Sequence, residues 1–307
     1  MSDSFTIRFL AHKEIDKNKW DHCINSADNG LIYAYSFYLD CMAKNWDALV
    51  LNDYEAVMPL TWNRKYGILY LYQPFLAAEL GVFGNSLNAE LIESFLRSVP
   101  KKFKYWDISL NHRNVFDINS FKLYQRNNFV LVMNKSYEGL YKAFSENIQR
   151  NIKKAEQAGC SAKKDFSSEE VIQLALQQMK PYSKSSEGNV ERFRNLYKYL
   201  HVNQQAITYG IFSRENKLLS SCVFFFSHNR AYYILVGNHP DGKEIGASHA
   251  VINAFIKDHA GKNLLLDFEG SDIPGLALFY KSFGAVEEKY SAIKLNRLSF
   301  FLKWVKK

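Results

Sequence analysis

Three consecutive, mostly apolar runs rich in β-branched and aromatic residues, separated by polar turn residues, predict three β-strands in the last third of the chain. The predicted strands are residues 208–213, 219–227 and 231–238. A turn-rich loop follows, and apolar residues then recur at helical spacing from Ser248 to about His259. An apolar run at 264–268, a short helix opened by Pro274 and a closing strand complete the pattern. The predicted order is three strands, helix, strand, helix and strand.

The first 134 residues give the same order of predicted elements. The predicted strands are 6–10, 48–51, 56–62, 67–72, 105–110 and 129–133. The predicted helices are 16–27, 36–44, 88–97 and a short one that ends near Asn128. We therefore expect an α/β (α+β) protein of two domains, residues 1–134 and 135–307, in each of which helices flank a mixed, mostly antiparallel sheet.

Local sequence similarities support an internal duplication. Residues 60–74 can be placed over 226–240 at a constant shift of 166. Asp107 and Asp267 each follow a phenylalanine by twelve residues, once in each half. The chain is therefore predicted to contain two copies of one fold.

The composition is that of a globular protein. With 307 residues, 47% of them apolar, the chain can bury a large core. Its four cysteines show neither Cys-x-x-Cys nor Cys/His spacing, so we predict no metal site and no disulfide framework, and a reducing, cytoplasmic compartment fits.

Charge and hydropathy restrict the partners. The N-terminus carries charges where a signal peptide needs an apolar run, and no stretch approaches the roughly 20 apolar residues that span a bilayer. The net charge of +8 favours acidic partners such as a nucleotide cofactor, tRNA or anionic lipid.

The loop before the predicted helix at Ser248 is the first candidate for chemistry. The N-terminus of a helix presents amide groups without intrahelical partners at the positive end of the helix dipole, and such a place binds phosphate. Here Lys243 adds a positive charge, Gly246 allows close backbone approach and Ser248 is a candidate N-cap. A glycine near a helix start is also an ordinary turn residue, so the loop alone leaves both interpretations open.

Residues 243–248, KEIGAS, resemble the pyrophosphate-binding loop of the GNAT acyltransferase superfamily. That loop has a basic or amide residue, two others, Gly, one other, and then Gly or Ala. Ser248 departs from the last position. The resemblance implies acetyl-CoA or another acyl-CoA as donor, with its pyrophosphate held by Lys243, Gly246, Ala247 and Ser248.

The resemblance also implies roles for the strand before the loop and for a later helix. The backbone of Val236, Gly237 and Asn238 would meet the pantetheine arm and the oxyanion, unless the last two residues merely end the strand. The segment LFYKSFG (278–284) resembles the superfamily's FY-x-x-x-G helix end, in which a tyrosine faces the leaving thiol. Tyr280 is thus the implied acid, with a packing role as the alternative.

Asp267 and Glu269 are the candidate general bases. On a predicted strand they are two residues apart and share one face, beside an apolar run that can raise a carboxyl pKa. Glu269 is preferred, because Asp267 has a counterpart, Asp107, in the first half, whereas Glu269 corresponds to Ser109. A structural role for Asp267 is the alternative.

Two GNAT folds in tandem resemble the Fem peptidyltransferases and their cytoplasmic acetyltransferase-like relatives. Residues 145–159, SENIQRNIKKAEQAG, are similar to the helix that opens the second domain of that family. The resemblance implies that Arg150 and Lys153 hold an acidic substrate, whereas a solvated basic face is the alternative. The long coiled-coil insertion of some cell-wall members is not visible, which disfavours the tRNA-dependent branch.

We therefore expect an N-acyltransferase that moves an acyl group, such as acetyl, from a coenzyme A thioester to a small-molecule or peptide amine. Residues 73–86 of the first half carry Glu79 and no cation, so the second copy is expected to hold the donor and the first to form the acceptor side. The alternatives are an aminoacyl-tRNA-dependent Fem-like peptidyltransferase and a catalytically inactive GNAT-fold binding protein.

The C-terminal tail, residues 297–307, is basic and amphipathic. Docking onto the protein itself is one interpretation of this pattern. Peripheral contact with a membrane surface is the other.

Overall fold

The computed structural model describes residues 6–117, 120–178, 185–270 and 272–298. The chain divides into a first unit, residues 1–126 with 289–307, and a second unit, residues 127–288. Strand β13 (Val286–Asn296), which lies within the predicted second domain, pairs along its last five residues with β6 of the first unit. Residues 299–307 of the basic tail lie outside the described residues.

The first unit contains a sheet in the order β1-β2-β3-β4-β6-β13, in which β4 and β6 are parallel and the other neighbours antiparallel. Besides β13, its strands are β1 (Ile7–Leu10), β2 (Asn45–Leu51), β3 (Ala56–Lys65), β4 (Ile68–Tyr72), β5 (Phe83–Gly84), which pairs with β3, and β6 (Phe103–Ser109). Its helices are α1 (Lys17–Ser26), α2 (Ser36–Met42) and α3 (Ala89–Ser98), with 3-10 turns η1 (His12–Glu14) and η2 (Ile32–Ala34).

The second unit contains a sheet in the order β7-β12-β11-β10-β9-β8, in which β11 and β12 are parallel. Its strands are β7 (Leu123–Val132), β8 (Ser161–Lys164), β9 (Ala206–Phe212), β10 (Leu218–Ser227), β11 (Arg230–Asn238) and β12 (Leu265–Asp267). Its helices are α4 (Tyr137–Lys142), α5 (Glu146–Gln157), α6 (Ser168–Gln178), α7 (Ser185–Val202), α8 (Pro240–Glu244), α9 (Ala247–His259) and α10 (Pro274–Lys281).

Each unit repeats one order of elements. The order β1-α1-α2-β2-β3-β4-α3-β6 in the first corresponds to β8-α6-α7-β9-β10-β11-α9-β12 in the second. In both, a parallel pair joins the last two strands of this series. The predicted class, a mixed and mostly antiparallel sheet flanked by helices, is confirmed.

Two details of the predicted duplication are wrong. The short helix expected to end near Asn128 is absent from the described residues, because β7 runs as one strand through this segment. Tyr72 pairs with Asp107 and Tyr232 with Asp267, and 232 minus 72 and 267 minus 107 both give 160. Equivalent strand residues are therefore 160 positions apart, and the shift of 166 misaligns them.

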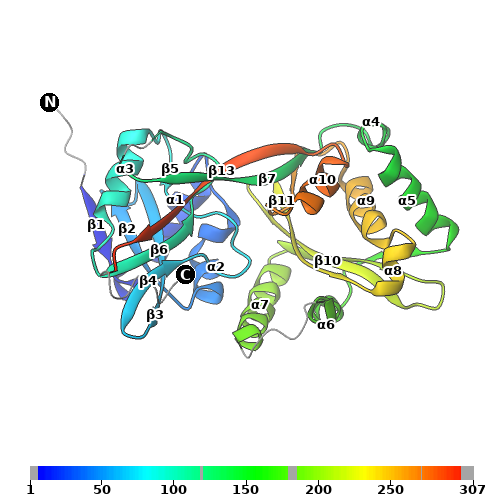
Figure 1. The fold of residues 1–307 in the computed structure, drawn as a ribbon, viewed down its shortest axis with the longest axis horizontal. Helices are drawn as coiled ribbons and strands as arrows, with labels where there is room; N and C mark the ends of the chain where they lie inside the picture. Colours follow the sequence, from blue (N-terminus) through cyan, green and yellow to red (C-terminus); the bar gives the residue numbers. More distant parts are fainter. Residues whose placement is uncertain (1–5, 118–119, 179–184, 271, 299–307) are drawn as a thin grey trace. The chain divides into compact units, whose positions relative to one another are not determined.

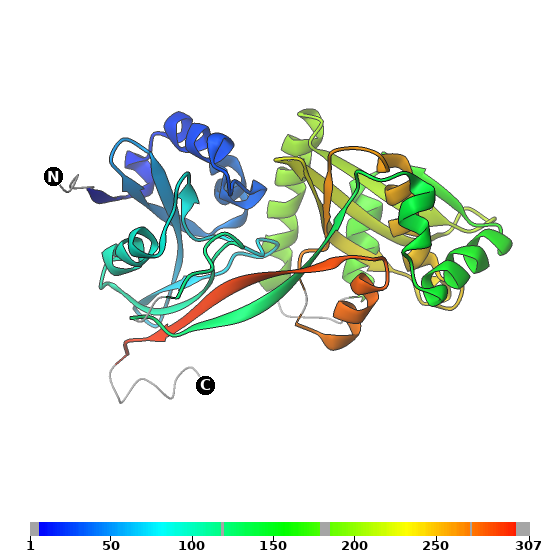
Figure 2. The same ribbon diagram turned by 90° about the horizontal axis from the view of Figure 1, so that it is seen from above.

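Alternating side chains of β10 attach helices to both faces of the second sheet. Phe224 stacks on Phe255 of α9, with ring centroids 3.7 Å apart. Its neighbour Phe225 points to the opposite face and stacks on Phe193 of α7 at 5.9 Å. Figures 1 and 2 show this arrangement within the second unit, with α6 and α7 on one face of the strands and α9 on the other. The candidate site lies at the end of β11, between α6 and the start of α9.

Candidate functional site

The parallel strands β11 and β12 separate after a short paired segment. They pair only over Arg230–Tyr232 and Leu265–Asp267, where β12 ends. From Tyr233 onward, β11 has no strand partner on this edge among the described residues. The separation leaves the far end of β11 accessible from one edge.

The backbone of β11 is irregular in this segment. Ser221 of β10 pairs with Gly237 and Val223 with Ile234, so Cys222 alone opposes Leu235 and Val236. This is a β-bulge, and Leu235 adopts φ = 47°, which is uncommon for a branched residue. The bulge therefore lies at Leu235–Val236, directly before Gly237.

Gly237 is required by helix packing. A Cβ atom at this position would lie 2.6 Å from the backbone nitrogen of Ala175 in α6. The absence of a side chain therefore lets α6 approach the end of β11, and no ligand is needed to explain the glycine.

Helix α9 begins after the predicted loop, which itself contains the short helix α8. Gly246, with φ = 79°, is the N-cap of α9 and provides no side-chain cap. Ser248 is the second residue inside the helix, so the N-cap predicted there is wrong. The amides of Ala247 and Ser248 have no acceptor within the helix, whereas the amide of His249 donates to the backbone oxygen of Gly246 at 3.0 Å. In the first unit, Asn88 caps α3 by accepting a hydrogen bond from the amide of Leu91.

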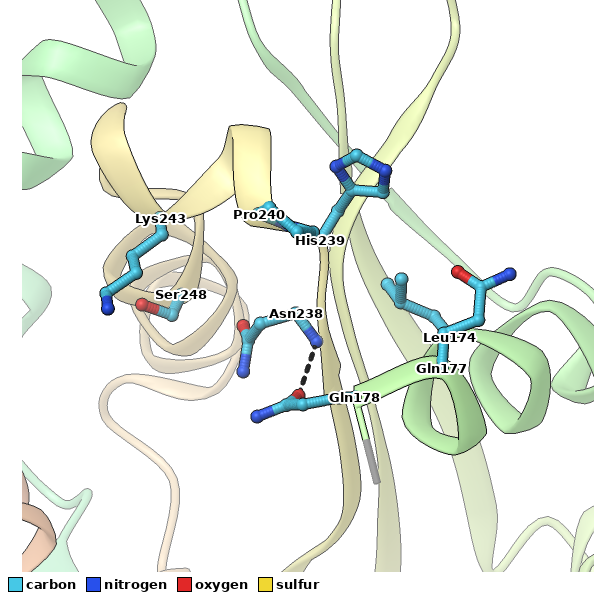
Figure 3. Close-up of a pocket in the computed structure, with 8 residues that line it drawn as sticks. All are labelled: Leu174, Gln177, Gln178, Asn238, His239, Pro240, Lys243 and Ser248. Carbon is cyan, nitrogen blue, oxygen red and sulfur yellow. Dashed lines mark hydrogen bonds between the residues drawn. The ribbon is translucent and has the colours of Figure 1, made fainter. Parts of the chain in front are cut away.

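A pocket of about 840 Å³ lies beside this helix start. Its lining residues come from α6, the end of β11 and the segment up to α9: Leu174, Gln177, Gln178, Asn238, His239, Pro240, Lys243 and Ser248. Figure 3 shows Lys243 and Ser248 together on one side, Leu174 and Gln178 of α6 on the other, and Asn238 between them. The structure thus brings three of the predicted donor-binding residues, Asn238, Lys243 and Ser248, to one pocket.

Two polar contacts fix Asn238 in this pocket. Its side-chain oxygen accepts a hydrogen bond from Ser220 Oγ at 2.7 Å. Its backbone amide donates to Gln178 Oε1 at 2.8 Å. Lys243, by contrast, is exposed and forms no ion pair with any residue that the structure describes, so its charge is available to a ligand.

Gly246 and Ala247 pack inward instead of lining the pocket. Ala247 is buried in the core of the second unit. A Cβ atom on Gly246 would lie 2.5 Å from the backbone oxygen of Asn151 in α5. Gly246 therefore allows α5 to pack closely against the start of α9.

The basic residues of α5 lie next to this contact. Arg150 is exposed and donates to Asn147 Oδ1 at 2.8 Å, and the same oxygen accepts from Asn151 Nδ2 at 3.2 Å. Lys153 is also exposed. Neither basic residue lines the pocket beside Lys243, so their role in substrate binding stays a prediction.

Asp267 belongs to a buried ion cluster. Its carboxylate accepts from Arg230 Nη1 at 2.6 Å and from Asn128 Nδ2 at 2.9 Å, and Arg230 also binds Glu288. Burial opposes the charge of Arg230, but Asp267 and Glu288 raise its pKa above the ordinary value. This cluster fixes β11 to β12 at the point where they separate.

Glu269 lies beyond the end of β12, so the predicted shared strand face with Asp267 is wrong. Its backbone has φ = 64°, and its amide donates to Asp267 Oδ1 at 2.8 Å. The two carboxylates therefore differ in setting, since Asp267 is engaged in the buried cluster and Glu269 is partly exposed.

Tyr280 is packed in the core on α10. Its ring stacks on Phe268, with centroids 4.6 Å apart. Burial, with a smaller contribution from the charge of Glu269, raises the pKa of Tyr280 to about 12. The hydroxyl is therefore protonated at neutral pH, as an acid must be, although the packing interpretation accounts for the same position.

Two residues near the site carry no sequence signal. Gln178 lies in a different helix, 60 residues before its partner Asn238. His249 is half-buried in the first turn of α9, where its ring contacts Phe279 and burial lowers its pKa. Only the fold brings them to this region.

Comparison with known proteins gives similarity of fold. No protein-family model and no curated protein matches the sequence. A structure described as FemX aligns at TM-score 0.63 with 12% identity, covering 93% of this chain and 97% of that one. A conserved protein of unknown function from Bacteroides thetaiotaomicron VPI-5482 aligns at 0.62 with 11% identity, covering 95% and 100%.

A third solved structure shows the same likeness. The C-terminal domain (DUF2156) of a putative lysylphosphatidylglycerol synthetase from Agrobacterium fabrum aligns at TM-score 0.52 with 8% identity, covering 92% of each chain. The fold is thus similar to that of FemX. No helix of the described residues is both long and apolar enough to cross a membrane.

Proposed function

We propose that this protein transfers an acyl group from a coenzyme A thioester to an amine. The observation that carries the proposal is that one pocket combines the start of α9, beside the exposed Lys243, with the end of β11, where no described strand pairs on one edge. Lys243, Ser248 and the first amides of α9 suit a pyrophosphate, and the edge of β11 suits an extended chain that contains amides. Coenzyme A contains both groups, and the pocket volume of about 840 Å³ is within the usual range of ligand sites.

In the part of the first unit that the structure describes, the corresponding helix start differs, which supports donor binding by the second unit. The N-terminus of α3 is capped by Asn88. Glu79, in the loop before it, is buried and accepts a hydrogen bond from the amide of His112 at 2.7 Å. A phosphate added there would meet a helix start whose Leu91 amide is already capped, and the carboxylate of Glu79 in place of a cation.

The proposed reaction needs a base, donors for the oxyanion and an acid. The acceptor amine attacks the thioester carbonyl, its nitrogen bonds to the acyl carbon, and the carbon–sulfur bond breaks. The amine proton passes to a base, for which Glu269 is the better placed carboxylate because Asp267 is bound to Arg230. Tyr280, protonated at neutral pH, supplies a proton to the departing thiolate.

Calorimetric titration with acetyl-CoA and longer acyl-CoA esters tests the proposal. Lys243→Glu replaces an attractive charge by a repulsive one and should weaken binding at least about 10-fold, with the fold unchanged because the residue is exposed. Lys257→Glu, at the other end of α9, is the matched control and should bind like the parent. Equal affinity of the Lys243→Glu variant and the parent would contradict the assignment of the pocket.

The exposed basic face of α5 supports a second candidate, an aminoacyl-tRNA donor. Arg150, Lys153 and Lys154 are exposed close to the contact between α5 and α9. This candidate predicts RNA binding whose affinity falls steeply with salt, because phosphate contacts release counterions. Binding of charged tRNA without binding of any coenzyme A ester would favour it, and ester binding without turnover would favour the inactive binding protein.

A further inference from the structure

The last residue of β11 has its backbone amide on the unpaired edge of the strand. In an antiparallel ladder, successive residues direct their N–H groups to opposite edges. The amide of His239 donates to Leu219 in the β10 segment, so it faces β10. The amide of Asn238 therefore faces the other edge, where β12 has already ended.

On this edge, a side chain instead of a neighbouring strand accepts the hydrogen bond of the Asn238 amide. Gln178, the last residue of α6, accepts a hydrogen bond from the Asn238 amide through its own carboxamide oxygen at 2.8 Å. Figure 3 shows this bond crossing the pocket from α6 to the end of β11, with Lys243 and Ser248 beyond Asn238. The acceptor atom is the carbonyl oxygen of an amide, and an extended ligand that contains amides offers the same kind of acceptor.

The bond is one that a ligand can displace. Gln178 is exposed, so its carboxamide can hydrogen-bond to water after displacement, and the displacement costs only the modest net strength of one hydrogen bond. The approach of α6 itself does not depend on this bond, because Gly237 and the buried residues Leu174 and Ala175 pack the helix onto β11.

We propose that the carboxamide of Gln178 occupies the hydrogen-bonding position of a donor amide on β11, so that the donor must displace it and its loss strengthens donor binding. This inference rests on the proposed function, since it assigns the ligand's amide chain to the edge of β11. In this arrangement Gln178 lowers the affinity for the donor by competing with it for the Asn238 amide. The phosphates of the donor lie at the Lys243 side of the same pocket.

Titration of Gln178→Ala with acetyl-CoA tests the inference. A displaced hydrogen bond of ordinary net strength predicts that this variant binds about 2- to 10-fold more tightly than the parent. Gln173→Ala is the matched control, because Gln173 is an exposed glutamine on the same helix, α6, and is not among the residues that line the pocket. Its affinity should equal that of the parent. Both substitutions are at exposed helix positions, and thermal melting checks that the fold is retained.

A second probe separates the amide chain from the phosphates. Adenosine 3′-phosphate 5′-diphosphate carries the phosphates of coenzyme A without its amides, so Gln178→Ala should leave its affinity unchanged. An equal gain for this probe would overturn the inference, because the effect would then come from pocket size. Equal or weaker binding of acetyl-CoA by Gln178→Ala, with the parent binding normally, overturns the inference and leaves the proposed function. Absence of acetyl-CoA binding in parent and variants overturns the proposed function and the inference together.

Discussion

Replacement of Asp267 by asparagine should destabilise the second unit strongly. Asp267 is only 2% exposed, and its two oxygens accept three hydrogen bonds. One oxygen accepts from Asn128 Nδ2 and from the amide of Glu269, and the other accepts from Arg230 Nη1. Asparagine has nearly the same shape but presents one NH₂ group, which must face a donor in either orientation.

The size of the effect follows from the partners that remain. Removal of one member of a buried ion pair costs roughly 3–5 kcal/mol, because the other charge stays buried. Arg230 keeps Glu288, with nitrogen–oxygen distances of 2.9 and 3.0 Å, and this partner reduces the loss. We therefore expect the free energy of unfolding to fall by about 3 kcal/mol, at the lower end of that range.

Urea unfolding followed by far-ultraviolet circular dichroism measures this loss. Tryptophan fluorescence is unsuited, because all five tryptophans lie in residues 1–126 and 289–307. Asp107→Asn is the matched control, since Asp107 occupies the equivalent place in the parallel pair of the first unit but is exposed. This control should change stability by less than about 0.5 kcal/mol. A loss below about 1 kcal/mol for Asp267→Asn, or an equal loss for Asp107→Asn, would refute the ion-cluster argument.

Three further predictions concern the helix start, pH and the acid. Gly246→Ala should lower the free energy of unfolding, measured with denaturant, by about 2–4 kcal/mol, because φ is positive and the added Cβ atom would clash with α5. The control is Gly261→Ala, where φ is 80° and an added Cβ atom would meet nothing within 4 Å. This control should lower the free energy of unfolding by only about 1 kcal/mol. Burial lowers the pKa of His259 from 6.5 to about 4, so its contribution to stability is present above pH 6.5 and lost as the pH falls toward 4. We expect about 2 kcal/mol of stability to be lost from this group between pH 8 and pH 5, and a clearly smaller loss for His259→Phe would confirm it. Tyr280→Phe should lower kcat about 100-fold with the affinity for acetyl-CoA unchanged, and an unchanged kcat would leave the tyrosine with packing alone.

Features decided by neighbouring residues could be predicted from the sequence. Runs of apolar, β-branched and aromatic residues predict the strands β9, β10 and β11 to within two or three residues, because such residues fit strands that are buried on both faces. The helix N-terminus at 246–248 and its basic residue Lys243 were likewise local. The KEIGAS segment therefore predicts a helix start beside a lysine, and a pocket lies at that helix start in the structure.

Features decided by residues far apart in the chain required the tertiary structure. Asp267 was a candidate base on a strand, but its carboxylate is bound to Arg230, 37 residues away, in a cluster that the sequence does not mark. Gln178 reaches Asn238 across 60 residues, and β13 pairs with β6 of the first unit. The periodicity of apolar residues in the sequence determines which face of an element is buried. A buried charge or an unpaired amide, by contrast, needs a hydrogen-bonding partner, and only the packing of the fold decides which distant side chain provides it.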